Sequence, residues 1–206
     1  MMVAKSIALF QETHSKEFEQ LLRKHLPNRN EKYYEILMNS RAYLLETSFK
    51  LNLTTESIIK QCHTARPTWY LYFPSVKHYY NEVVCVLGNL MIDYSLDYLE
   101  RNANYQNWTD EARSLKMMVF LSNAKSLTGY FPELQLCWSE LYTKLINGYA
   151  RILGPILKLS PDRTHLFMRN IANEIIVHKE LFFADMDMFE RFVNREYALF
   201  LAEQNN

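Results

Sequence analysis

Apolar residues recur along most of this chain at three- and four-residue steps, which is the spacing of one helix face. A first amphipathic helix is predicted over residues 15–26, where Phe18 and Leu22 share a face, and Pro27 ends it. A second helix begins at about Glu31. Because no strand-length run alternates apolar and polar residues, the pattern predicts an all-α fold.

Capping residues and prolines mark the following helices. Thr54 precedes a short helix, with Ser57 three residues on as a partial capping box. Pro67 suits the first turn of another short helix, which Pro74 ends, and Ser75 caps a longer one. Further helices are predicted over about 89–102, 109–127, 131–158, 161–180 and 185–203.

Composition narrows the class of protein. Only 4 of the 206 residues are glycine, so folds built on glycine-rich phosphate loops are disfavoured. The 23 basic and 23 acidic side chains cancel, which leaves no global basic field. Residues 1–80 nevertheless carry a net charge of +4 and residues 81–206 one of −4, as in a DNA-binding head on a regulatory body. Uneven sampling of charges accounts for this asymmetry equally well.

Signals for other classes of site are weak. Cys62, Cys85 and Cys137 form no CxxC pair, so we expect neither a disulfide framework nor a zinc site, and a reducing cytoplasm is the simplest compartment. No apolar run has the length of a membrane span or a signal peptide. Glu174 and His178 are four residues apart and favour a surface pair over a metal site. We expect no enzyme activity, no catalytic residue, no metal and no cofactor.

The stretch from Thr54 to Lys77 is the most informative. Two short helices separated by three or four residues, the second opening at Pro67, predict a helix-turn-helix. The second helix of such a motif places its first side chains in the major groove of DNA.

The end of this stretch carries a family motif. The run TWYLYFPSVK, from Thr68, resembles the signature T-hydrophobic-Y-x-H-F-x-S-K that closes the DNA-binding domain of tetracycline-repressor (TetR) family regulators. Thr68, Tyr70, Phe73 and Ser75 match that signature, whereas Tyr72 stands where histidine is usual. The resemblance extends over residues 42–86.

The sequence also departs from this family. His63 occupies the position of the glycine in the turn, which favours a left-handed backbone. Glu56 stands where many members are basic, and Val76 replaces the lysine after the capping serine. These changes leave open an alternative, a helical protein-interaction module on the same scaffold that has lost DNA binding.

The resemblance implies a homodimeric transcriptional regulator with a double-stranded DNA operator as its partner and no membrane partner. Residues 31–80 would form the three-helix DNA-binding domain, and residues 81–206 the helical bundle that binds an effector and dimerises. The helix within residues 1–30 precedes this family-like core. The expected DNA contacts are Thr54, Thr55, Arg66, Pro67, Thr68, Tyr70, Tyr72 and Lys77.

These contacts have different expected roles. Arg66 at the tip of the second helix has the fork that binds guanine. The threonines either bind phosphate or serve only as caps. By the resemblance, Tyr70 faces phosphate and Tyr72 faces the groove. Lys77 is either a phosphate contact or a solvated lysine.

Aromatic residues and methionines recur at helical spacing after residue 90. They fit either an ordinary bundle core or a pocket for a small hydrophobic or aromatic effector, since ligand sites form between the helices of bundles. The candidate pocket residues are Tyr94, Tyr98, Met117, Phe120, Trp138, Tyr142 and Phe167.

The last two predicted helices carry an apolar stripe. Facing water, it would be a large exposed patch for a monomer. Pairing these helices with their copies about a two-fold axis would bury it; covering their own core is the alternative. The candidate interface residues are Phe167, Ile171, Ile175, Phe189, Phe192, Val193 and Phe200.

Overall fold

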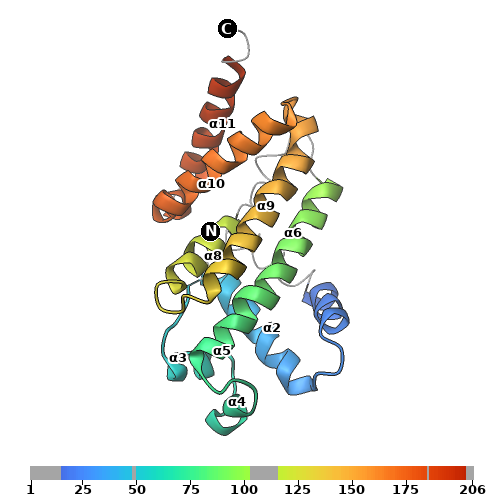
Figure 1. The fold of residues 1–206 in the computed structure, drawn as a ribbon, viewed down its shortest axis with the longest axis vertical. Coiled ribbons are helices and arrows are strands. Elements are labelled where there is room, and N and C mark those ends of the chain that lie inside the picture. Colours follow the sequence, from blue (N-terminus) through green and yellow to red (C-terminus); the bar gives the residue numbers. More distant parts are fainter. Residues whose placement is uncertain (1–14, 48–49, 103–115, 185, 203–206) are drawn as a thin grey trace. The chain divides into compact units, whose positions relative to one another are not determined.

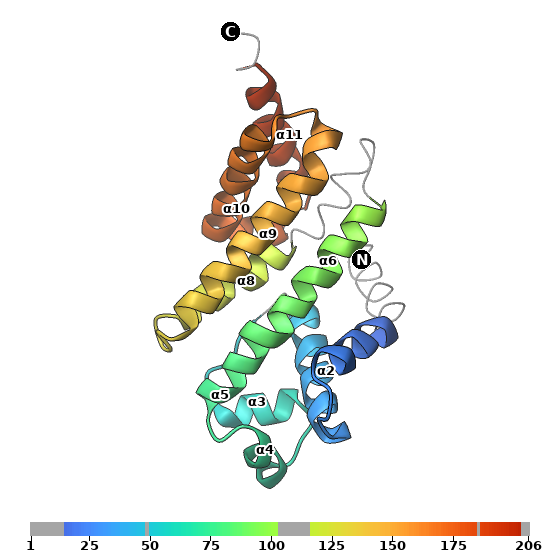
Figure 2. The same cartoon turned by 45° about the vertical axis from the view of Figure 1, so that its right-hand side comes forward.

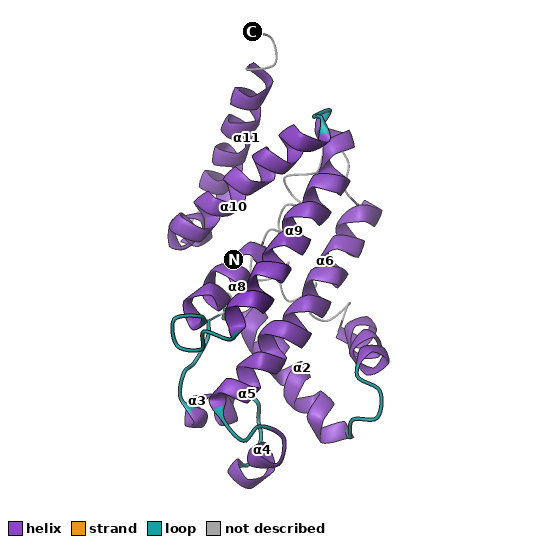
Figure 3. Ribbon diagram, in the orientation of Figure 1, coloured by secondary structure: helices purple, strands orange, loops and turns teal. Residues whose placement is uncertain are grey.

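A computed structural model shows the described part of the chain as helices with loops between them (Figures 1 and 3). The structure describes residues 15–47, 50–102, 116–184 and 186–202. Within these ranges no residue belongs to a strand, so the predicted all-α class is confirmed. No helix in the described part is long and apolar enough to cross a bilayer.

The helices follow the predicted order closely. Residues 15–25 are helical. The labelled helices before residue 103 are α2 (Glu31–Glu46), α3 (Thr55–Gln61), α4 (Arg66–Tyr72), α5 (Val76–Asn81), the π-helix η1 (Glu82–Leu87) and α6 (Gly88–Asn102). Those after residue 115 are α8 (Lys116–Leu127), α9 (Leu134–Leu157), α10 (Pro161–Ala184) and α11 (Met186–Ala202).

The described residues fall into two compact units. The first comprises Met1–Tyr94 with Asn123–Trp138, and the second comprises Ser95–Ser122 with Ser139–Asn206. The boundaries lie inside α6, α8 and α9 rather than in a linker. The units therefore differ from the predicted division at residue 80.

Side-chain caps begin three helices of the first unit. The Tyr33 amide donates to Asn30 Oδ1 at 3.0 Å and so begins α2. As predicted, Thr54 accepts from the backbone of α3 and Ser75 from that of α5, each at 3.3 Å. α4 has no side-chain cap, but Pro67 in its first turn lacks the amide hydrogen that would need one.

Aromatic rings form much of the core that supports α4. Trp69, Phe73, Tyr79 and Tyr80 are all buried. The Phe73 ring meets the Tyr79 ring edge-on, with centroids 5.4 Å apart, and the Trp69 ring lies 5.7 Å from that of Phe73. These contacts fix α4 against α5 within the first unit.

Residues 76–102 form one uninterrupted helical run, in which η1 joins α5 to α6. The helix start expected near residue 89 is therefore absent. Gly88 keeps ordinary helical dihedral angles (φ −60°, ψ −43°), and apolar side chains are buried on both sides of it. Nothing at that point ends the helix.

The second unit packs its helices closely. A side chain at Gly148 of α9 would collide with the Leu96 side chain of α6, so glycine allows these helices to approach. Lys158 ends α9 in a left-handed conformation (φ 54°). α10 runs beyond the predicted end at residue 180 but has a kink at His178 (φ −115°, ψ 22°).

Candidate nucleic-acid interface

The two short predicted helices are present as α3 and α4, joined by residues 62–65 (Figure 2). His63 has φ 48°, so the left-handed turn expected at this position is confirmed. Histidine tolerates this region better than bulky or β-branched residues do. The amide of His63 donates to the Lys60 carbonyl at 3.2 Å, and that of Thr64 to the Ile59 carbonyl at 3.2 Å, which closes α3.

A buried polar network lies behind this turn. Gln61 Nε2 of α3 donates to the Tyr79 hydroxyl of α5 at 2.7 Å. The Tyr79 hydroxyl donates to Ser40 Oγ of α2 at 3.0 Å, and Ser40 Oγ donates to the Ile36 carbonyl at 2.7 Å. Three helices are thus joined by consecutive hydrogen bonds between buried side chains, where each group left without a partner would be costly.

Two asparagines extend the network to the loops around α3. Asn52 Nδ2 donates to Gln61 Oε1 at 2.9 Å and to the Tyr43 hydroxyl at 2.8 Å. Asn39 Nδ2 donates to the Cys62 carbonyl at 3.0 Å. Burial raises the pKa of the Cys62 thiol, so this cysteine stays protonated and structural at neutral pH.

α4 presents one face to solvent. Arg66 and Tyr70 are four residues apart on this face, as are Pro67 and Leu71, and all four are exposed. Leu71 is 80% exposed, whereas Trp69 on the opposite face is fully buried. In the described part of the chain Arg66 makes no hydrogen bond or ion pair, so its guanidinium is available to a ligand.

Tyr72 does not lie on that outer face. Its hydroxyl donates to Asn30 Oδ1 at 2.8 Å, and its ring lies 5.9 Å from the Tyr33 ring. Asn30 Oδ1 also caps α2, so one side-chain oxygen ties α4 to the start of α2. A base contact by Tyr72 would have to compete with Asn30, and its expected place in the groove stays a prediction.

Lys77 has an acidic partner. Its ammonium lies 2.5 Å from Glu133 Oε1, and both side chains are about half exposed, at 54% and 41%. The hydrogen bond from Lys77 lowers the pKa of Glu133. A phosphate would have to compete with this carboxylate for Lys77.

The three threonines lie in different settings. Thr54 Oγ1 accepts from the Ser57 amide and donates to Ser57 Oγ at 2.8 Å, which is the role of a helix cap. Thr55 and Thr68 are half-buried. Glu56, in the first turn of α3, is exposed beside them.

The candidate effector residues are not gathered in one unit. Met117, Phe120 and Phe167 are buried in the core of the second unit, as ordinary core residues are. Half-buried Tyr98 and Tyr142 belong to the same unit. The remaining two, Tyr94 and Trp138, belong to the first unit.

Four residues of the apolar stripe on α10 and α11 are buried. The Phe167 and Phe200 rings meet edge-on with centroids 5.2 Å apart, and Ile171 and Val193 are buried with them. The argument from a water-facing stripe is wrong for these four residues, because α10 and α11 cover one another. Phe192 is half-buried, and the side chains of Ile175 and Phe189 lie outside the described part.

The cysteines correct another expectation. Cys85 of η1 and Cys137 of α9 form a disulfide within the first unit, with Cα atoms 5.8 Å apart. They are separated by 52 residues, so no short-range cysteine spacing in the sequence predicted the pair. Glu174 and His178 form an exposed pair at 3.7 Å, and no cluster of metal-binding side chains occurs within the described ranges.

No family model, curated protein or solved structure matches this chain. The resemblance to TetR-family regulators therefore rests on the motif residues alone.

Proposed function

We propose that the chain is a DNA-binding transcriptional regulator that uses α4 as its recognition helix. The observation that carries this proposal is the outer face of α4, where unpartnered Arg66 lies beside Pro67, Tyr70 and Leu71. In a helix-turn-helix, the first side chains of the second helix contact base edges. The buried network behind the turn supports the proposal, because base contacts require a rigidly held helix.

Each side chain on that face suits a part of the DNA duplex. The Arg66 guanidinium matches the O6 and N7 acceptors of guanine, and the Leu71 side chain suits the thymine methyl group. The Tyr70 hydroxyl makes no hydrogen bond in the described residues and suits a phosphate oxygen.

In this proposal the protein is regulated as a dimeric repressor with two states, one of which binds the operator. Two recognition helices must lie about one helical turn of DNA, roughly 34 Å, apart to bind two half-sites. A small hydrophobic or aromatic effector that favours another separation weakens operator binding, and DNA weakens effector binding by the same coupling free energy.

The test is selection of duplex DNA from a random library with the full chain. We expect an enriched palindrome, and Arg66→Ala should weaken binding to it by about 1–3 kcal/mol. Arg169→Ala changes an exposed arginine of α10 and serves as the control, with no loss expected. A library without enrichment, or equal losses in the two variants, would contradict α4 as the recognition helix.

The second candidate function is a protein-interaction module. The exposed carboxylate of Glu56, the pairing of Lys77 with Glu133 and the exposed Leu71 favour it. Retention on random duplex DNA separates the two, since phosphate-mediated binding is lost steeply as salt rises. A module without DNA binding passes through unretained at low salt.

A further inference from the structure

Arg41 is a buried cation that has no anionic partner among the described residues. It lies on α2 and is only 4% exposed. Its guanidinium carbon lies 4.3 Å from the centre of the Phe18 ring, and across the described ranges it has no hydrogen bond or ion pair. Burial lowers its pKa to about 10, so the side chain still carries a charge at neutral pH.

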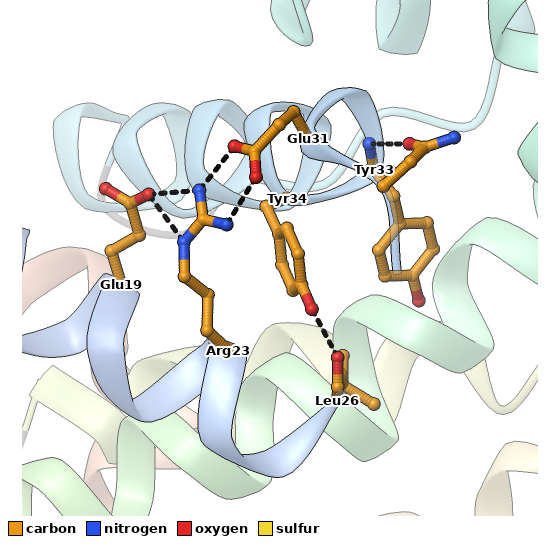
Figure 4. A network of polar contacts seen from close by, with 7 residues as sticks. Glu19, Arg23, Leu26, Glu31, Tyr33 and Tyr34 are labelled. Atoms are coloured by element: carbon orange, nitrogen blue, oxygen red, sulfur yellow. Dashed lines mark hydrogen bonds and ion pairs between the residues drawn. The ribbon is translucent and has the colours of Figure 1, made fainter. Parts of the chain in front are cut away.

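Arg23, in the same unit, is an arginine whose guanidinium has both a ring contact and carboxylate partners. Its guanidinium carbon also lies over a ring, 4.5 Å from the centre of Tyr34. It donates in addition to Glu19 Oε1 at 2.7 Å and to both carboxylate oxygens of Glu31 at 2.7 and 2.6 Å (Figure 4). Arg41 has a comparable ring contact but no carboxylate partner among the described residues.

An isolated buried charge is unfavourable, and an apolar side chain of similar volume is often as good or better for stability. Arg41 is therefore poorly explained as a core residue. The fully buried polar atoms that lack a hydrogen-bond partner include no nitrogen of Arg41. Because these nitrogens have no hydrogen bond in the described residues either, the edge of the guanidinium still reaches solvent. An incoming anion can meet it there.

Two aromatic rings lie near this cation, those of Phe18 and Tyr94. The Tyr94 ring meets the Phe18 ring edge-on, with centroids 6.0 Å apart. The Tyr94 hydroxyl donates to Glu17 Oε2 at 3.1 Å, which holds that carboxylate on tyrosine and not on Arg41. The Phe18 ring is fully buried beneath the guanidinium, whereas the Tyr94 ring is half-buried. Among the described residues, the surroundings thus offer one cation and one partly exposed ring.

We propose that Arg41 and Tyr94, with the buried Phe18 ring supporting the guanidinium, form a binding site for a small monocarboxylate with an aromatic or other apolar body. One guanidinium presents two parallel donors, which match one carboxylate. The partly exposed Tyr94 ring suits the apolar body, and a single cation suits one negative charge better than the two of a phosphate. All three residues belong to the first unit, and the site does not depend on DNA binding.

The test measures thermal unfolding and calorimetric binding of the full chain with sodium benzoate. Benzyl alcohol has the same ring without the charge, and sodium chloride matches the ionic strength. We expect benzoate to raise Tm with concentration, as a ligand of the native state does, and the other two not to. Arg41→Met should abolish the benzoate shift, whereas Arg23→Met, the matched ring-stacked arginine, should retain it.

Stability without ligand separates a binding role from a structural one. Arg41→Met should raise the Tm of the ligand-free protein, because it removes a buried charge; a lower Tm would assign Arg41 to the fold and contradict the proposal. Arg41→Lys keeps a cation without the two-pronged fork, and we expect weaker benzoate binding. Unchanged affinity in either Arg41 variant, or no benzoate shift in the wild type, would overturn the site.

Discussion

Single side chains far apart in sequence hold the α3–α4 turn in place. The Tyr79 side chain is fully buried, and its hydroxyl contacts Ser40 and Gln61, which lie 39 and 18 residues away. Burial raises its pKa well above the usual tyrosine value, so it remains a neutral donor and acceptor. The geometry of the turn therefore depends on polar atoms in the core as well as on local propensity.

Tyr79→Phe should lower the free energy of unfolding by about 1–3 kcal/mol, because Gln61 and Ser40 keep their polar atoms and lose their shared partner. Urea denaturation measures this loss. Tyr70→Phe is the matched control, since the exposed Tyr70 hydroxyl has no hydrogen bond in the described residues, and its midpoint should not move. Equal effects in both variants would mean that the network contributes nothing to stability.

At the scale of single residues, effects that involve near neighbours in the sequence could be predicted, whereas hydrogen bonds between distant residues could not. Thr54 and Ser75 cap helices as expected, and His63 adopts the left-handed turn, because each effect involves only the next few residues. The hydrogen bond of Tyr72 was not predicted, since its partner Asn30 lies 42 residues earlier. Sequence spacing carries no information about such a pair.

At the scale of elements, the disulfide ties η1 to the first turn of α9. η1 continues α5 and packs on α2, where the Tyr33 hydroxyl donates to Glu82 Oε2 at 2.7 Å. The remaining cysteine, Cys62, is buried and hydrogen-bonded. Cys85 and Cys137 thus form the pair without competition from an accessible third thiol.

Reduction of this disulfide should destabilise the protein. Closing a chain segment of 52 residues lowers the entropy of the unfolded state, which corresponds to about 4 kcal/mol in the chain-entropy model. Urea denaturation with and without reductant measures the difference. Cys137→Ser should be less stable under oxidising conditions and unaffected by reductant; a wild-type midpoint that ignores reductant would contradict a closed bond.

The ion pair between α5 and the start of α9 bears on DNA binding. Glu133→Gln removes the carboxylate that holds Lys77, so the lysine becomes available to phosphate. We expect tighter binding to random duplex DNA at low salt and a steeper salt dependence. Glu140→Gln, at an exposed position of α9, is the charge-matched control. Equal gains in the two variants would reflect net charge alone and would place Lys77 away from DNA.

Helix positions were predictable because each helix has its own periodicity and end signals. The boundaries of the compact units were not, since they lie within α6, α8 and α9, where the apolar spacing is continuous. For the same reason, the sequence did not predict that α5, η1 and α6 form one continuous helical run. Hydrophobic periodicity locates helices but does not say which helices share a core.

At the scale of the whole molecule, the apolar stripe illustrates that limit. A stripe predicts burial without saying by what, and Phe167, Ile171, Val193 and Phe200 are buried within one chain. A two-fold contact through α10 and α11 must therefore use their outward residues. Among the described side chains of these helices, the large apolar ones that are exposed are Leu166 (52%), Val177 (70%) and Leu199 (52%).

Dimerisation remains a prediction, and these exposed residues make it specific. Two half-sites require two recognition helices, so we expect light scattering after size exclusion to give about twice the chain mass of 24.6 kDa. Leu199→Glu should dissociate the dimer, because a two-fold face carries the new charge twice. Leu199 is half exposed within one chain, so the monomer should tolerate glutamate and keep its helical circular dichroism. Asn194→Glu adds the same charge at an exposed polar position of α11 and should remain dimeric. A wild-type mass of one chain would contradict the two-half-site mechanism, whereas a Leu199→Glu dimer would exclude this face of α11 as the contact.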